Sequence, residues 1–172
     1  MLADAVVRGL VDVAIALYAA AVVARGRAPR TADACWAGAW TWTALHAAAA
    51  FVFVHHGDHA LLLREAADRT EAAVGVRFGE GIYLNYFLLA VWGFDVAVRW
   101  ARRRRPAFFP RWPALAVELF VAFMMFQATV VFGTGWIRWA GAIGTAALGV
   151  LLAVRRLRAV PAPAHAPGRE AG

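Results

Sequence analysis

The chain has 172 residues but contains no serine and no lysine, and its only cysteine is Cys35. Without serine there is no nucleophile for a serine intramembrane protease. One cysteine can form no disulfide within the chain and cannot supply the thiolates of a zinc finger. Gly79-Glu80-Gly81 is too short for a nucleotide-binding glycine loop. These absences exclude several enzyme classes and leave it undecided whether the protein is an enzyme.

Apolar surface is what the chain has in excess. Hydrophobic residues make up 62% of it, and the mean hydropathy is +0.58. Soluble domains are about 45–50% apolar, and so short a chain cannot bury the excess in one aqueous core. The net charge of +7 comes entirely from arginines, which lie in short clusters between apolar runs. That pattern is typical of membrane topology and not of nucleic-acid binding, so we expect a lipid bilayer as partner and no nucleic acid.

Five apolar stretches are long enough to cross the hydrocarbon, which takes about 20 residues. They are residues 5–24, 35–54, 82–100, 113–132 and 136–154. The sequence therefore predicts an all-α integral membrane helix bundle of five transmembrane helices in a single domain, residues 1–158. Gly133, Thr134 and Gly135 predict a tight turn between the last two helices. The Pro/Ala-rich stretch 159–172 predicts a disordered tail.

Residues 58–74 predict one further, short helix. Leucines and alanines form one apolar face, and charged residues occupy the rest. Asp58 can cap its start and Gly75 can end it. We expect this amphipathic helix to lie on the outer membrane interface.

The charged residues of the connections predict the orientation. Loop one, loop three and the segment after the last span are rich in arginine: Arg25, Arg27, Arg30, Arg102, Arg103, Arg104, Arg105, Arg111, Arg155, Arg156 and Arg158. The second connection carries more acids than bases. Positive charge favours the cytoplasmic side, so the pattern predicts a multi-pass protein of the bacterial cytoplasmic (inner) membrane. Its N-terminus is expected outside and its C-terminus in the cytoplasm.

Polar residues within a bilayer are costly and need a reason. In the predicted topology several helices bring polar side chains to one outer level: Asp12, His55, His56, His59, Asn85, Tyr86 and Gln127. This convergence predicts an outward-facing polar site. His46 is expected near the midplane, where a lone histidine usually hydrogen-bonds across a helix interface.

The histidines give the most specific prediction for this site. His55 and His59 are four residues apart, so on a helix they would share one face and could bind one transition-metal ion. His56 and Asp58 could complete the first or second shell. The alternative is a histidine-rich interfacial cap that hydrogen-bonds to the second connection. Haem and di-iron centres are disfavoured, because they need histidines on further helices.

The charged residues inside the spans have competing interpretations. Arg8 and Asp12 are four residues apart and are expected to pair. Asp95 and Glu118 lie in the inner halves of their helices. They could be neutralised by protonation or pair with the arginines of loop three. A proton or ion path would use them together with His46, whereas a structural role would leave them in helix-to-helix bonds.

A sequence motif spans residues 46–95. His46 is followed by HHxxH, by Thr70-Glu71, by GEGIYLNY and then by Trp92 and Asp95. This order resembles a family of small bacterial multi-pass membrane proteins with no established activity. The resemblance implies that one set of residues belongs together: His46, His55, His56, His59, Thr70, Asn85, Tyr86 and Asp95.

Three functions follow from these patterns. The first is a membrane protein with an outward-facing histidine-centred site that binds a metal or takes part in redox chemistry. The second is a small transporter or channel for protons or a solute. The third is an accessory scaffold subunit of a membrane complex, or a self-associating protein, because small residues such as Gly141, Gly144 and Gly149 allow close helix contacts.

Overall fold

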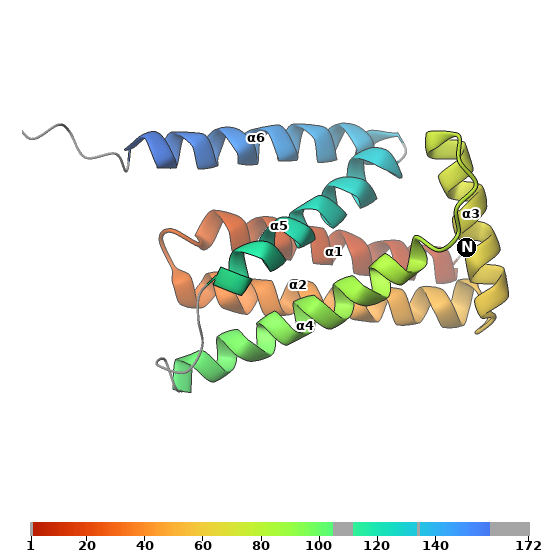
Figure 1. Cartoon of the computed structure of the whole chain (residues 1–172), viewed down its shortest axis with the longest axis horizontal. Coiled ribbons are helices and arrows are strands. Elements are labelled where there is room, and N and C mark those ends of the chain that lie inside the picture. Colours follow the sequence, from red (N-terminus) through yellow and green to blue (C-terminus); the bar gives the residue numbers. More distant parts are fainter. Residues whose placement is uncertain (1, 105–111, 134, 159–172) are drawn as a thin grey trace, which may run out of the picture.

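A computed structural model describes residues 2–104, 112–133 and 135–158, and their regular elements are all helices (Figure 1). The α-helices are α1 (Leu2–Ala24), α2 (Pro29–Ala49), α3 (His59–Val74), α4 (Ile82–Arg104), α5 (Trp112–Phe126) and α6 (Trp136–Arg158). Two π-helical segments, η1 (Ala50–Val54) and η2 (Gln127–Val131), extend α2 and α5. The predicted all-α fold is confirmed.

Four of these helices are long and apolar enough to cross a membrane. They are Leu2–Ala24, Pro29–Val54, Ile82–Arg104 and Ala114–Val131. The second starts earlier than predicted because Pro29 fits the first helical turn, where its missing N–H costs nothing. The predicted fifth span falls on α6, a helix of 23 residues, and its membrane crossing stays a prediction.

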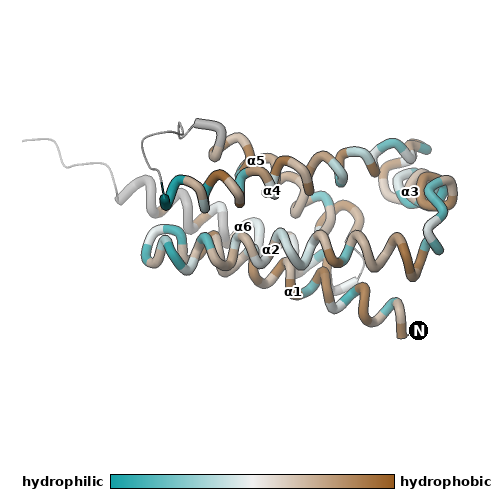
Figure 2. Tube along the Cα trace, turned by 90° about the horizontal axis from the view of Figure 1, so that it is seen from below, coloured by the Kyte–Doolittle hydropathy of each residue, from teal (hydrophilic) through white to brown (hydrophobic). Residues whose placement is uncertain are grey.

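The long helices run side by side, and α3 lies crosswise at one end of them (Figure 1). The α1–α2 connection and the last turn of α4 lie at the opposite end, where hydrophilic residues gather in Figure 2. Arg25, Arg27, Arg30 and Arg102–Arg104 therefore share one end of the molecule. We call it the arginine end, and we call the other the α3 end. The first connection and the last turn of α4 thus lie at the same end, and the membrane orientation stays a prediction.

The core lies where α1, α2, α4 and α5 meet. Trp36 and Trp92 are almost completely buried, with their ring centroids 5.0 Å apart. Alanines allow α1 and α2 to approach closely, because Ala21 and Ala39 are both fully buried. The core residues are Tyr18, Ala21, Val22, Trp36, Ala39, Leu88, Trp92, Val121 and Met124.

The amphipathic helix predicted at 58–74 is α3. Asp58 caps it by accepting hydrogen bonds from the backbone N–H groups of Ala60 and Leu61, at 2.8 and 3.1 Å. The backbone N–H groups of Leu61 and then Ala60 lower the pKa of the Asp58 carboxyl, because they stabilise its charged form. Gly75 ends the helix with φ of 77°, a conformation that suits glycine.

Helix α6 is attached at one end. Its main contacts are with η2 and α5, where Gly141 packs directly against Thr129. Gly135, in the predicted tight turn, has φ of 56°. Thr134 and the predicted tail, 159–172, lie outside the described residues.

Candidate functional sites at the two ends of the bundle

The predicted helical pairing of His55 with His59 is wrong. The α2–η1 helix ends at Val54, and α3 begins at His59. His56 and Gly57 between them have φ of 51° and 73°. A left-handed pair of residues reverses the chain instead of continuing a helix, so the two histidines lie on either side of a turn and share no helical face.

His55 is buried beneath α3. It is 7% exposed, and its Nδ1 lies 3.3 Å from Oε2 of Glu65 on α3. This distance suits an ion pair, but the geometry is not that of a hydrogen bond, and Nδ1 has no hydrogen-bond partner among the described residues. A buried polar nitrogen without such a bond is unusual and costs about 1–3 kcal/mol.

His59 belongs to a different group, together with two tyrosines of α4. Its ring stacks on Tyr86 with centroids 6.1 Å apart, and Tyr83 lies at the same distance from both rings. The Tyr86 hydroxyl is 3.4 Å from His59 Nδ1. Tyr83 and Tyr86 are 51% and 41% exposed. We call His59, Tyr83 and Tyr86 the aromatic shelf.

The predicted metal site is not assembled. In the part of the chain that the structure describes, no three His, Cys, Asp or Glu side chains are placed to hold one ion. His56, the proposed third ligand, is exposed on the turn. The structure therefore gives the metal interpretation no support, and the reason is the break in the helix at Gly57.

The other residues predicted for the outer site do not join it in the described chain. Thr70 donates its hydroxyl to Ala66 O of its own helix, at 2.8 Å. Asp12 and Asn85 are exposed, and Gln127, half-buried, begins η2. The expected Arg8–Asp12 ion pair is absent from the ion pairs of the described residues, so that expectation is wrong.

His46 has the cross-helix bond expected of it. Its Nδ1 lies 2.8 Å from the backbone oxygen of Val7 on α1. Because a carbonyl oxygen only accepts, Nδ1 must carry the proton and donate. His46 thus ties α2 to α1.

A second cluster, which sequence reasoning did not assemble, lies toward the arginine end. Asp95 on α4 is 5% exposed. It accepts hydrogen bonds from Trp36 Nε1 on α2 at 2.9 Å and from Arg99 Nε at 2.5 Å. Arg99 is one helical turn from Asp95, a spacing that puts both on one helix face.

Arg99 carries the network to further helices. Its Nη2 donates to Glu118 of α5 at 2.7 Å, and its Nη1 lies 3.5 Å from Asp33 of α2. Glu118 also pairs with Arg25 in the α1–α2 connection. Arg103 donates to Asp33 at 2.8 Å. These groups are three cations and three anions: Arg25, Arg99, Arg103, Asp33, Asp95 and Glu118.

The ring of Trp36 completes this network. The guanidinium carbons of Arg25 and Arg99 lie 4.9 and 5.2 Å from its centroid, within the range of cation–π attraction. Although Trp36 lies next to the start of a predicted span, it is a core residue. Two features of the sequence pointed to this network: Trp36 lies three residues after Asp33, and Asp95 and Arg99 are one helical turn apart.

The network identifies described partners of Asp95 and Glu118. Within the residues that the structure describes, Asp95 pairs with Arg99, and Glu118 pairs with Arg99 and Arg25. Because the acids are matched by cations and join four segments of the bundle, the arrangement favours a structural role over a proton or ion path.

No protein-family model matches this sequence, and no curated protein and no solved structure is similar to it. The two clusters are therefore interpreted from their own geometry. The resemblance noted for residues 46–95 stays a prediction.

Proposed function

We propose that this chain is a multi-pass protein of the bacterial cytoplasmic membrane that binds a small ligand at its outward-facing α3 end. The observation that carries the proposal is His55. Its buried Nδ1 has no hydrogen bond among the described residues and lies 3.3 Å from Glu65, and the turn that follows His55 leads directly to His59 of the aromatic shelf. A ligand, or a water held by one, that hydrogen-bonds to this nitrogen would recover the free energy that its burial costs.

The backbone around His55 supports a binding role. It follows the π-helical turn η1 and precedes His56, a non-glycine residue at positive φ. Both features are uncommon, and both are frequent at functional sites.

The aromatic shelf indicates which class of ligand the site would bind. Exposed rings at a membrane interface stack with planar molecules, and the Tyr86 hydroxyl and His59 ring supply hydrogen-bonding groups beside them. A planar ring that carries hydrogen-bonding oxygens, such as a quinone headgroup in the membrane, fits this chemistry. The redox character expected for the site would then reside in the ligand.

The orientation part of the proposal has its own test. Cys35→Ala provides a cysteine-free background, into which Asp68→Cys on α3 or Arg27→Cys in the first connection is introduced. A membrane-impermeant maleimide should label position 68 in intact spheroplasts and position 27 only after permeabilisation. The reverse pattern would contradict the proposed orientation.

The ligand part is tested with ubiquinone-1 added to purified protein in detergent, with binding followed by calorimetry. We expect one saturable site per chain. Tyr86→Phe keeps the ring but loses the hydroxyl, and Glu65→Gln removes the charge beside His55. Each should weaken binding by roughly 2- to 10-fold, the value of one hydrogen bond. Arg104→Gln, at the other end, is the control. Absence of saturable binding, or equal binding by His59→Ala, would reject the proposal.

A role as an accessory subunit is a second candidate, favoured by α6. Trp139, Ile143 and Val150 are each more than 60% exposed, and the helix is attached mainly through η2 and α5. Native purification in mild detergent checks this function. Recovery of monomer alone would count against it.

A further inference from the structure

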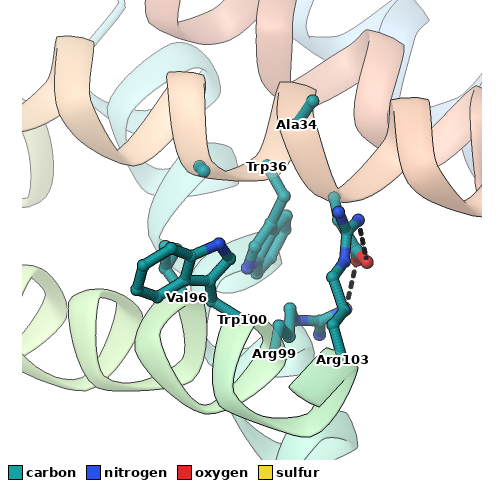
Figure 3. A pocket seen from close by; sticks show the side chains of 8 residues that line it. Ala34, Trp36, Val96, Arg99, Trp100 and Arg103 are labelled. Carbon is teal, nitrogen blue, oxygen red and sulfur yellow. Dashed lines mark hydrogen bonds and ion pairs between the residues drawn. The ribbon is translucent and has the colours of Figure 1, made fainter.

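A pocket of about 150 Å³ opens between α2 and α4 at the arginine end (Figure 3). Its lining residues are Asp33, Ala34, Trp36, Ala37, Val96, Arg99, Trp100 and Arg103. It lies far from the α3 end and is independent of the function proposed above. Two tryptophans and two arginines in so small a space give it both apolar and cationic walls.

The apolar wall of the pocket is partly exposed. Trp100 is 62% exposed, and exposed tryptophan is characteristic of the membrane–water interface. Val96 on α4 lies farther from the arginine end than Trp100 and Arg103, and Ala37 on α2 lies farther from that end than Asp33. A molecule in this pocket would therefore meet hydrocarbon-like surface on one side and charge on the other.

At the rim of the pocket, positive charges outnumber negative ones. Arg103 is paired with Asp33, and its Nη2 also lies 3.5 Å from the backbone oxygen of Arg30. The guanidinium of Arg104 lies 4.3 Å from the ring centroid of Trp100. Arg30, Arg103 and Arg104 are all exposed, whereas Asp33 is the acid on this rim and is shared with Arg99.

Arg103 has the capacity to bind a further anion. Its described hydrogen bonds both leave from Nη2, and a guanidinium carries five N–H donors. Planar guanidinium groups bind phosphate oxygens in pairs, which gives both energy and orientation. Arg104, whose described contact is with a ring, adds a second charge beside the same opening.

We propose that this pocket binds the phosphodiester headgroup of an anionic phospholipid from the leaflet at the arginine end. Arg103 and Arg104 contact the phosphate, and Val96 and Trp100 contact the glycerol and the first acyl carbons. Basic pockets between transmembrane helices at this depth are suited to such headgroups. The site does not depend on which side of the membrane the arginine end faces.

Native mass spectrometry of the full chain, released from detergent, tests this proposal with phosphatidylglycerol and phosphatidylcholine as probes. We expect a preference of at least about tenfold for phosphatidylglycerol. Arg103→Gln and Arg104→Gln should each lower its affinity by roughly 10- to 100-fold, the range for a hydrogen bond to a charged group. Arg64→Gln, an exposed arginine on α3, is the matched control and should leave it unchanged.

A competition experiment and two contradicting outcomes complete the test. Millimolar inorganic phosphate should not displace the lipid, and if it does, the pocket is a free-phosphate site and the lipid assignment fails. Equal binding of both lipids, or an equal loss in Arg64→Gln, would also overturn the proposal. Because Arg103→Gln also breaks the Asp33 pair, Arg104→Gln alone decides the case if Arg103→Gln fails to fold.

Discussion

The charged network makes Asp95→Asn the most informative single substitution. Asparagine keeps an oxygen that can accept the Trp36 indole N–H, so the hydrogen bond at 2.9 Å can survive. What it removes is the negative charge facing Arg99 at 2.5 Å. The substitution therefore isolates the charge from the shape of the side chain.

The size of the expected stability loss follows from the burial of the pair. The side chains of Asp95 and Arg99 are 5% and 16% exposed, so little water screens the pair. Removing one partner of a buried pair costs about 3–5 kcal/mol. Because Glu118 still neutralises Arg99 at 2.7 Å, we expect a loss near the lower limit, about 3 kcal/mol of unfolding free energy.

The assay is reversible unfolding in mixed micelles with a rising fraction of dodecyl sulfate, followed by far-ultraviolet circular dichroism. Asp95→Asn, Arg99→Gln and the double variant form a cycle whose coupling energy should be about 1–3 kcal/mol. Asp68→Asn is the control, since its pair with Arg77 on α3 is solvent-exposed and such pairs contribute little.

One result would refute the reasoning. If Asp95→Asn changed the unfolding free energy by less than about 0.5 kcal/mol, the size of a neutral surface change, the charge of Asp95 would contribute nothing measurable to stability. The network would then not be held together by this ion pair.

Three more predictions concern single positions. Trp36→Phe removes one of the two described donors to Asp95 and should cost about 1–3 kcal/mol in the same unfolding assay, because a buried hydrogen bond to a charged group is lost. Gly79→Ala would place a Cβ 2.4 Å from Leu63 O, so hydrogen exchange should show reduced protection throughout α3. The lowered pKa of Asp58 means that its capping contribution is present above the ordinary value of 3.8 and is lost as the pH falls through the lowered value. Amide exchange at Ala60 should therefore rise in acid in the native protein and not in Asp58→Asn, which caps without a charge.

The helices could be predicted from the sequence because the features that define them lie in neighbouring residues. An apolar stretch of the right length, with Pro29 at a start or Gly75 at an end, defines a helix whatever surrounds it. The bounds of α3 follow in the same way from Asp58 and Gly75. Such features need only neighbouring residues to act.

The meeting of charged residues was not predictable in this way. Asp33 and Arg103 are 70 positions apart, and their contact depends on how α2 and α4 are rotated against each other. Length and hydropathy carry no information on that rotation. The sequence therefore indicated that Asp95 and Glu118 need protonation or a cationic partner, but it did not identify Arg99 and Arg25 as partners.

The histidine pair failed for a reason that the sequence contained. If Asp58 caps a helix, then a new helix begins at His59, and His55 cannot belong to it. The capping signal and the metal-spacing signal contradicted each other. The hydrogen bonds from Ala60 and Leu61 to the Asp58 carboxylate decide the conflict in favour of the cap.

The π-helical turn η1 makes the position of His55 sensitive to the deletion of a single residue. Its closing bond runs from His55 N to Ala50 O at 3.0 Å, one residue longer than an α-helical bond. Deleting one residue within Ala50–Val54 would restore the α-helical pitch and turn the following residue by about 100° around the helix axis. Such a protein would keep every side chain named at the α3 end and yet turn His55 away from Glu65. The phase of α2, as much as its composition, determines what lies beneath α3.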